Sequence, residues 1–204
     1  MSDGPRREYD AAAAAYDRRW AEYTRRTLAL LRPWLAEAPP RALVDIGCGT
    51  AELLVALRRW KLAPGHYVGA DPSPGMLRVA AAKLDAASAL VAAPAEALPL
   101  RGGAFDCAVS ASALHFWPTP EAGLAEVRRV LAPGGRFLLL DWSRDFVTMR
   151  AMDAWVRMTG HSIVRTYSRA EMASMLARAG FRVRRARRAR VGGAWGVEVI
   201  EAVP

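Results

Sequence analysis

Ala42-Leu-Val-Asp-Ile-Gly-Cys-Gly-Thr-Ala-Glu52 is the stretch around which the rest of the chain is organised. Its apolar half has the length of a β-strand, and helical spacing of apolar residues starts directly after the glycines, with Leu53, Leu54 and Leu57. Glycines allow left-handed backbone angles and the close approach of a ligand, and the helix that follows offers unpaired amides. The stretch therefore predicts a strand, a tight ligand-binding turn and a helix.

Two acidic residues frame this unit. Asp45 interrupts the apolar strand, and a carboxylate near a buried strand end needs a partner: either it orders the glycine turn or it faces a cationic part of a ligand. A second short strand, residues 66–70, ends at Asp71, one strand–helix–strand unit further along. An acid about 20 residues beyond a glycine turn is placed to accept both hydroxyls of a ribose. A ligand that contains a nucleoside is therefore expected.

Strands and helices alternate through the next part of the chain. The further predicted strands cover residues 89–92, 105–110 and 136–140, with a sharp turn at 133–135 before the last of them. Such alternation predicts a doubly wound, mostly parallel sheet with its ligand outside the carboxyl ends of the strands. Residues 181–191 and 194–203 flank Gly192-Gly193 and predict a terminal antiparallel hairpin.

Two helical segments lie outside this alternation. Residues from about 7 to 32 are rich in helix formers. One face of this helix is aromatic and carries Tyr9, Tyr16, Trp20 and Tyr23. That face either packs on the domain or forms a lid over the pocket. Residues 146–160 predict a helical insertion with His161 in a surface loop behind it, and all of residues 1–204 are assigned to one domain.

Composition narrows the classes of protein. With 204 residues and 52% hydrophobic content the chain can bury one core, and a formal charge of +9 favours anionic partners, although most arginines lie in scattered pairs typical of solvated helix faces. No charged-then-apolar leader is recognisable, and no apolar run approaches the ~18 residues of a membrane span, so we expect a cytoplasmic protein. Cys48 and Cys107 have neither metal nor disulfide spacing, and we expect reduced thiols and no metal site.

Five motifs, taken in order, resemble those of the class I S-adenosylmethionine-dependent methyltransferases, in particular the branch with quinone-biosynthesis and other small-molecule enzymes. The matching residues are 44–50 (VDIGCGT), 69–73 (GADPS), 95–99 (AEALP), 105–106 (FD) and 131–135 (LAPGG), and 179–181 (AGF) also fits. The resemblance implies a seven-stranded Rossmann-like sheet with an antiparallel last strand, and S-adenosylmethionine as the cofactor.

The same resemblance assigns roles to residues. The glycine turn would pass close to the methionine part of the cofactor, Asp71 would hold the ribose, Met76 would pack near the adenine, and Ser110 would line the methionine side. The expected cofactor site comprises Asp45, Gly47, Cys48, Gly49, Asp71, Pro72, Met76, Ala95, Glu96 and Ser110, with Tyr16 closing over it.

Two positions depart from the family pattern. Ala51 stands where a third glycine is usual, and one extra methyl group should be tolerated if the helix shifts slightly. Pro94 stands where the family commonly has an acid that accepts from the adenine amino group. The adenine is then held by the amide of Ala95, by Glu96 or by packing alone.

Methyl transfer from a sulfonium is an in-line displacement, which needs an aligned acceptor and the exclusion of water. A base is required only when the acceptor carries a proton of high pKa. The candidate catalytic residues are His115, Asp141 and Arg144; the alternatives are a hydrogen-bonded wall histidine and an Asp141–Arg144 ion pair that orders the loop. Aromatic residues expected around the acceptor are Phe116, Trp117, Trp142 and Trp155, with Tyr16 or Trp20 as a lid. They favour a small aromatic, quinone-like or lipid-like acceptor.

Other functions fit the sequence less well. A nicotinamide-dependent oxidoreductase would need a third glycine where Glu52 stands. An RNA methyltransferase or a non-catalytic cofactor-binding module would use the arginines of residues 182–190. Strand alternation places Arg182, Arg184 and Arg188 on one face and Arg185 and Arg187 on the other, which favours a solvated strand over a nucleic-acid surface. The oligomeric state stays open, a homodimer included.

Overall fold

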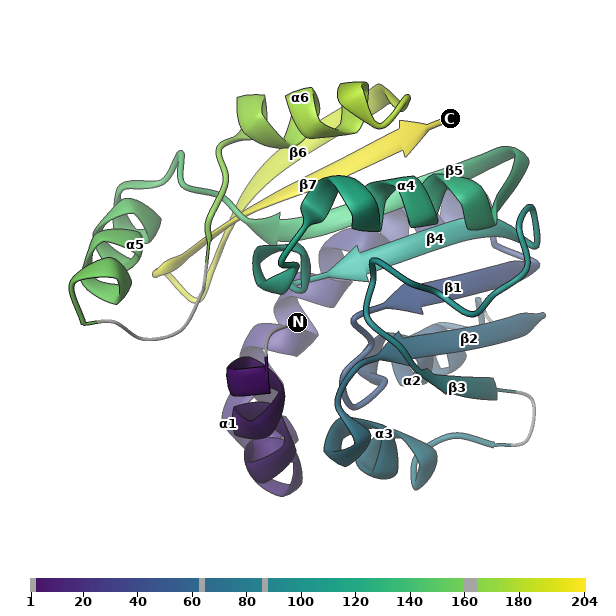
Figure 1. The fold of residues 1–204 in the computed structure, drawn as a ribbon, viewed down its shortest axis with the longest axis horizontal. Helices are drawn as coiled ribbons and strands as arrows, with labels where there is room; N and C mark the ends of the chain where they lie inside the picture. Colours follow the sequence, from purple (N-terminus) through teal and green to yellow (C-terminus); the bar gives the residue numbers. More distant parts are fainter. Residues whose placement is uncertain (1–2, 63–64, 86–87, 160–164) are drawn as a thin grey trace.

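A seven-stranded sheet runs through the molecule in the order β3-β2-β1-β4-β5-β7-β6 (Figure 1). The computed structural model describes residues 3–62, 65–85, 88–159 and 165–204. The strands are β1 (Ala42–Ile46), β2 (His66–Asp71), β3 (Ser88–Ala92), β4 (Phe105–Ala111), β5 (Leu131–Trp142), β6 (Arg182–Val191) and β7 (Trp195–Val203). Strands β1 to β5 pair in parallel, whereas β7 is antiparallel to both β5 and β6. The predicted fold, including the terminal hairpin, is confirmed.

Helices cover both faces of the sheet, which is why its central strands read as continuous apolar runs. The helices are α1 (Asp3–Glu37), α2 (Glu52–Arg59), α3 (Pro74–Ala81), η1 (Leu114–Phe116), α4 (Pro120–Val130), α5 (Val147–Thr159) and α6 (Arg169–Arg178). One core joins α1 and α2 to the sheet around Leu43 and Leu138. The other joins α4 and α6 to the sheet around Val44 and Leu139. Neighbouring residues along one strand thus pack into the cores on opposite faces of the sheet.

Helix α1 is longer than its sequence predicts. It continues through Pro33 to Glu37, beyond the expected end near residue 32. Leu31 and Leu35 are both 0% exposed and lie in the core against the sheet. Their burial outweighs the hydrogen bond that a proline removes from a helix.

Strand β5 starts earlier than the predicted residue 136, and the expected turn lies within it. Leu131 pairs with Phe105, and the next pair is Arg136 with Cys107. The residues between them are extra on one strand, and Gly134 takes a left-handed φ of 75° there.

A β-bulge in β6 changes which face of the sheet its arginine side chains occupy. The register shifts between Val183 and Arg185, which makes Arg184 the extra residue. Arg184 Nη1 donates to Glu201 Oε1 at 3.2 Å, and Arg185 Nε donates to Glu201 Oε2 at 2.6 Å. The prediction that Arg184 and Arg185 lie on opposite faces is therefore wrong, because simple alternation does not survive a β-bulge.

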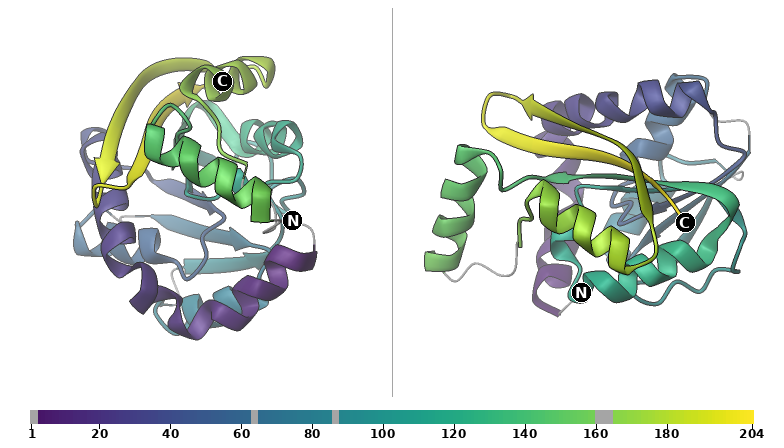
Figure 2. Two further views of the ribbon diagram at one scale, coloured as in Figure 1. Left: turned by 90° about the vertical axis from the view of Figure 1, so that its left-hand side faces the viewer. Right: turned by 90° about the horizontal axis from the view of Figure 1, so that it is seen from above.

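Helix α5 stands apart from the sheet. Figures 1 and 2 show it beyond the carboxyl end of β5, beside the β6–β7 turn and at the opposite end of the hairpin from the C-terminus. It occupies the segment where an insertion was expected, and His161 lies outside the described residues. Among the helices that the structure describes, none combines the length and the apolar character needed to cross a bilayer.

Candidate cofactor and active site

A crevice lies at the carboxyl ends of β1, β2 and β4, underneath α1. It consists of two cavities, of about 630 Å³ and about 540 Å³, which share Tyr16, Gly47, Gly49 and Ser112 in their walls. Predicted cofactor residues that line one cavity or the other are Asp45, Gly47, Cys48, Gly49, Asp71, Pro72, Met76, Ala95, Glu96 and Tyr16. The structure thus brings nearly the whole predicted set together.

The glycine turn between β1 and α2 has a shape that only glycine allows. Gly47 has a φ of 76°, and a Cβ atom added there would lie 2.3 Å from the Cβ of Ala113. The amides of Gly47 and Cys48 both donate to the carbonyl of Ala70, at 2.8 and 3.1 Å, so the turn is tied to β2. The backbone at this point is exposed to the crevice and fixed in place.

Ala51, where the family usually has glycine, also takes a left-handed φ of 63°. For a non-glycine residue this conformation costs about 1 to 2 kcal/mol. The side chain is 0% exposed, and burying one methyl group returns about 0.8 kcal/mol. The two effects nearly cancel, which explains how alanine is accommodated at this position.

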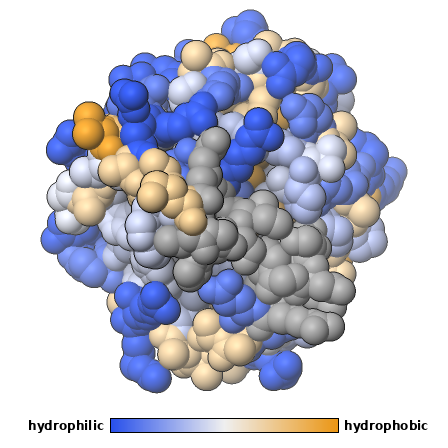
Figure 3. All heavy atoms as spheres, turned by 60° about the vertical axis from the view of Figure 1, so that its left-hand side comes forward, coloured by the Kyte–Doolittle hydropathy of each residue, from blue (hydrophilic) through white to orange (hydrophobic). Residues whose placement is uncertain are grey.

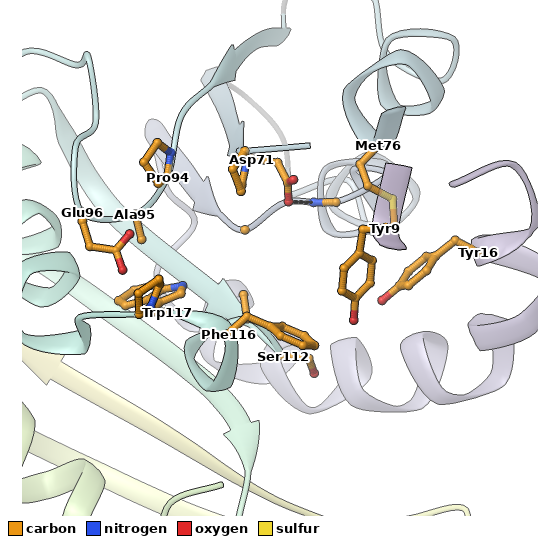
Figure 4. A pocket seen from close by; sticks show the side chains of 15 residues that line it. Tyr9, Tyr16, Asp71, Met76, Pro94, Ala95, Glu96, Ser112, Phe116 and Trp117 are labelled. Carbon is orange, nitrogen blue, oxygen red and sulfur yellow. Dashed lines mark hydrogen bonds between the residues drawn. The ribbon is translucent and has the colours of Figure 1, made fainter. Parts of the chain in front are cut away.

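Asp71 lies at the end of β2 with its carboxylate in the first cavity (Figure 4). Oδ2 accepts from the amide of Gly49 and Oδ1 from the amide of Ser73, both at 2.9 Å. Burial raises the pKa of this carboxyl, while these two hydrogen bonds oppose the rise. A carboxylate has about four lone-pair sites, so Asp71 keeps acceptor capacity for two further donors.

Asp45 lines the second cavity, on the far side of the glycine turn from Asp71. Burial, together with the nearby charge of Asp71, raises the pKa of the Asp45 carboxyl to about 8. Among the described residues that line the two cavities there is no lysine or arginine, whereas Glu52 and Glu96 add two more acids. The crevice therefore favours a ligand with a positive charge.

The other end of the first cavity is an apolar slot. Pro94 and Ala95 line it and Trp117 closes one side, whereas Met76, 2% exposed, lies on the other side of Asp71, toward Tyr9 and Tyr16 (Figure 4). Glu96 is the acid at this end, and its Oε1 already accepts from the amide of Thr119 at 3.2 Å. The slot suits a flat ring.

Helix α1 is held over the crevice by two aspartates. Asp10 Oδ1 accepts from the hydroxyl of Ser73 at 2.6 Å and from the amide of Gly75 at 2.7 Å, at the first turn of α3. Two helical turns further on, Asp17 Oδ1 accepts from the Thr50 hydroxyl at 2.6 Å. These contacts attach the helix to both sides of the first strand–helix–strand unit.

Tyrosines complete the attachment. The Tyr23 hydroxyl lies 2.8 Å from the Ser112 Oγ and accepts from Trp142 Nε1 at 2.7 Å. Tyr9 and Tyr16 project from α1 into the first cavity (Figure 4). Burial raises the pKa of Tyr16 to about 12 and that of Tyr9 further, so both phenols are neutral in the ordinary pH range.

His115 and Asp141 form a buried pair behind the crevice. Their Nδ1 and Oδ1 atoms lie 2.5 Å apart, and the imidazole stacks on Trp142 with ring centroids 4.1 Å apart. The Nε2 atom of His115 is buried and has no hydrogen-bond partner within the part of the chain that the structure describes. His115 itself does not line the two cavities, but Phe116 does, with its ring centroid 4.1 Å from that of His115.

Other predicted residues lie elsewhere. Ser110 is 0% exposed and lines neither cavity; Ser112, which sequence reasoning missed, lies there instead. Arg144 Nη2 lies 2.5 Å from Glu171 Oε1, so the expected pairing of Arg144 with Asp141 is replaced by one with the start of α6. Trp155, expected near the acceptor, lies on α5 with 57% of its surface exposed.

The sequence did carry a signal for Asp10 and Asp17, which sequence reasoning missed, whereas the tyrosines beside them were expected on the aromatic face of this helix. Tyr9, Tyr16 and Tyr23 recur every seven residues, and Asp10 and Asp17 follow the first two by one position. Seven residues are close to two helical turns, so each set lies on one side of α1. Within the part of the chain that the structure describes, no group of three or more His, Cys, Asp or Glu side chains is placed to hold a metal ion.

Comparisons with known proteins agree with this geometry. A family described as a methyltransferase domain matches residues 44–139. The ubiquinone/menaquinone biosynthesis C-methyltransferase UbiE of Acidiphilium cryptum is 33% identical over 169 residues, which cover 70% of this chain and 67% of that protein. The chain belongs to the class I S-adenosylmethionine-dependent methyltransferases.

Further proteins resemble this chain in sequence or in three-dimensional structure. An uncharacterised methyltransferase of Mycobacterium tuberculosis is 35% identical over 157 residues, 77% of this chain and 59% of that protein. The chain thus spans about three fifths of the length of such curated relatives. The solved 1,6-didemethyltoxoflavin-N1-methyltransferase of Burkholderia thailandensis, with bound S-adenosylhomocysteine, has a TM-score of 0.74 at 18% identity, over 97% of this chain and 85% of that one. This likeness shows the shared fold.

Proposed function

We propose that the protein transfers a methyl group from S-adenosylmethionine to a small aromatic, quinone-like or lipid-like acceptor. The observation that carries the proposal is the crevice with a buried acid on each side of the glycine turn. Asp71 faces one cavity and Asp45 the other, and no cationic side chain among the described residues neutralises them there. Such a site fits a ligand with hydroxyls at one point and positive charge at another.

The residues present fit the cofactor part by part. Asp71 has free acceptor capacity for ribose hydroxyls, and the apolar slot lined by Pro94, Ala95 and Trp117 accepts a flat base. Gly47 lets the backbone come close, and Asp45 faces the end where the methionine ammonium would lie. When bound, S-adenosylmethionine supplies a methyl group that its sulfonium charge has already activated. The protein then aligns the acceptor and keeps water out.

Aromatic side chains form the wall next to this position. Phe116 and Trp117 come from the segment after β4, and Tyr9 and Tyr16 from α1. Flat apolar molecules pack well between such rings. The Acidiphilium cryptum relative is a ubiquinone/menaquinone biosynthesis C-methyltransferase, which supports a quinone-like acceptor. We further propose that residues 1–204 act as one domain with α1 as its lid.

An RNA methyltransferase or a binding module is less well supported. Three of the β6 arginines are already engaged by carboxylates: Arg184 and Arg185 by Glu201, and Arg188 by Asp145. An arginine that is neutralised within the protein contributes little to phosphate binding. Nucleic acid is therefore not proposed as a partner, and a homodimer stays a prediction from sequence.

Binding of S-adenosylhomocysteine tests the cofactor assignment directly. We expect tight binding by isothermal titration calorimetry and a loss of about 10- to 100-fold in affinity for Asp71→Asn, because hydrogen bonds to a charged group are worth about 1.5 to 3 kcal/mol. NAD should not bind.

Asp106→Asn is the matched control. Asp106 also accepts from backbone amides, those of Arg41 and Ala42. It lies at the amino ends of β1 and β4, away from the crevice at the carboxyl ends of the strands. This variant loses the same charge and should keep the affinity of the wild type. If the wild type, Asp71→Asn and Asp106→Asn bind S-adenosylhomocysteine with equal affinity, the crevice is not the cofactor site. Acceptors are then identified by screening quinols and phenols for homocysteine release in a coupled assay.

A further inference from the structure

Helix α5 has an exposed apolar face. Val147, Trp155 and Met158 are 72%, 57% and 85% exposed, and they are the large hydrophobic residues that the described part of the chain leaves exposed. Ala151 and Ala154 are exposed as well. At 100° per residue these five positions fall on one side of the helix. We call them the α5 stripe.

The opposite side of α5 already attaches the helix to the protein. Met149 is 1% exposed, and Asp153 is 6% exposed and accepts from the Thr166 hydroxyl at 2.9 Å. Exposed apolar side chains are ordinary when single, but a continuous stripe on a projecting helix marks an interaction surface. The α5 stripe is thus accessible to a binding partner outside the folded domain.

The charges around the stripe indicate what that partner is. Arg150 is exposed on α5 itself, one turn from Val147, and Arg165 is exposed on the segment that returns from the helix. Arg190 lies over the ring of Phe146, 5.6 Å from its centroid, beside the start of α5. The only acid in the helix is the buried Asp153, and the chain carries a formal charge of +9. Figure 3 shows hydrophobic surface directly beside strongly hydrophilic surface at this end of the molecule.

We propose that the α5 stripe docks the protein onto an anionic lipid membrane surface. Apolar side chains of an interfacial helix enter the boundary of the acyl chains, and tryptophan prefers the depth of the headgroups. Arginines at the edge of such a helix are attracted by anionic headgroups. A second copy of this chain would instead bring more positive charge against the same arginines, so the charges favour the membrane over self-association.

Docking in this way would face the acceptor side of the crevice toward the bilayer. The amide of Arg165, next to the contact between Thr166 and α5, donates to the carbonyl of His115 at 3.2 Å. A lipid-borne acceptor would then reach the site without crossing water. This consequence rests on the proposed function, whereas the docking itself is measured without methyl transfer.

Sedimentation with lipid vesicles tests the proposal. We expect the full chain to bind vesicles of phosphatidylcholine with phosphatidylglycerol and to bind phosphatidylcholine alone much more weakly. Exchanging Val147, Trp155 and Met158 for Ser together should weaken the binding by about tenfold or more, because the apolar contacts are lost. Met158→Asp is a milder second variant at the most exposed position. S-adenosylhomocysteine affinity should stay unchanged in both, which separates failure of docking from failure of the proposed function.

A matched pair of arginine variants isolates the charge. Arg150→Ser removes a cation beside the stripe, and Arg182→Ser removes an exposed one at the far end of β6, with the same change in net charge. Only Arg150→Ser should weaken binding to the anionic vesicles, and added salt should weaken the wild type. Three results would overturn the proposal: no vesicle binding by the wild type, equal binding by the stripe variants, or a dimer in sedimentation velocity that the stripe variants dissociate.

Discussion

The Nδ1 atom of His115 lies 2.5 Å from Oδ1 of Asp141, and each side chain is 1% exposed. A carboxylate can only accept, so in the neutral imidazole the proton resides on Nδ1 and the lone pair on Nε2. Asp141 Oδ1 also accepts from the amide of Trp142 at 2.6 Å, which fixes the carboxylate. Among the described residues the buried Nε2 has no hydrogen-bond partner, so its lone pair is free to take a proton from an acceptor that reaches it.

Exchange of either partner should slow methyl transfer to an acceptor that must lose a proton. We expect Asp141→Asn and His115→Gln each to lower kcat by about 100-fold, the usual contribution of a general base, with little change in S-adenosylhomocysteine affinity. Unchanged rates in both variants would show that the pair only supports the wall of the site.

Asp45 predicts a pH dependence of folding and binding. Its pKa of about 8 in the folded protein, raised by burial, compares with 3.8 when the group is free. Between these values the folded state holds a proton that the unfolded state has lost, so this group lowers the stability of the ligand-free protein as pH rises from about 4 to 8. Melting temperatures of wild type and Asp45→Asn should therefore converge as pH falls through this window.

Cofactor binding should lower the raised pKa of Asp45 again. A positive charge next to Asp45 favours the carboxylate, so binding near pH 7 should release a proton and the affinity should increase from pH 6 to pH 8. Calorimetry in buffers of different ionisation enthalpy measures the proton count. Asp45→Asn should show neither effect, and 5′-methylthioadenosine, which lacks the amino acid part, should show none with the wild type. If the affinity of the wild type does not depend on pH, the positive charge of the ligand does not lie next to Asp45.

Local spacing made much of this fold predictable. The strand before Gly47, the helix after it and the position of Asp71 are all encoded within one strand–helix–strand unit, and the structure has them as expected. The hairpin was equally clear, because Gly192 and Gly193 separate two strand-like runs. In each case the signal and the structure it specifies lie within a few residues of each other.

Features that depend on distant contacts were not predictable in the same way. Nothing local reveals that His115 pairs with Asp141 or that the buried Leu35 carries α1 past Pro33. Ser110 was expected in the site because the resemblance to the family implied it. Ser112 lies there because its backbone leaves the strand with a left-handed φ of 58°, an irregularity that the sequence does not show.

The attachment of α1 predicts how fast a bound ligand leaves. Tyr23→Phe removes the hydroxyl that meets Ser112 and Trp142, and it leaves the Nε1 of the half-buried Trp142 without this partner. We expect a loss of about 1 to 3 kcal/mol in unfolding free energy. Because the helix covers the crevice, the dissociation rate of S-adenosylhomocysteine in stopped flow should rise more than the association rate. Tyr67→Phe, whose hydroxyl donates to the Leu62 carbonyl at 3.4 Å outside the crevice, should leave both rates unchanged.

Gly47 and Gly134 offer a matched test of the turn at the centre of the site. Their φ angles are 76° and 75°, so alanine at either position costs the same backbone strain of about 1 to 2 kcal/mol. At Gly134 an added Cβ meets nothing within 4 Å, whereas at Gly47 it lies 2.3 Å from the Cβ of Ala113. Gly134→Ala should therefore lower the melting temperature and keep S-adenosylhomocysteine binding, while Gly47→Ala should lose binding. Adding Ala113→Gly to Gly47→Ala removes the clashing atom and should restore part of the affinity. Equal loss in Gly47→Ala and Gly134→Ala would mean that strain, and not the space between Gly47 and Ala113, controls the site.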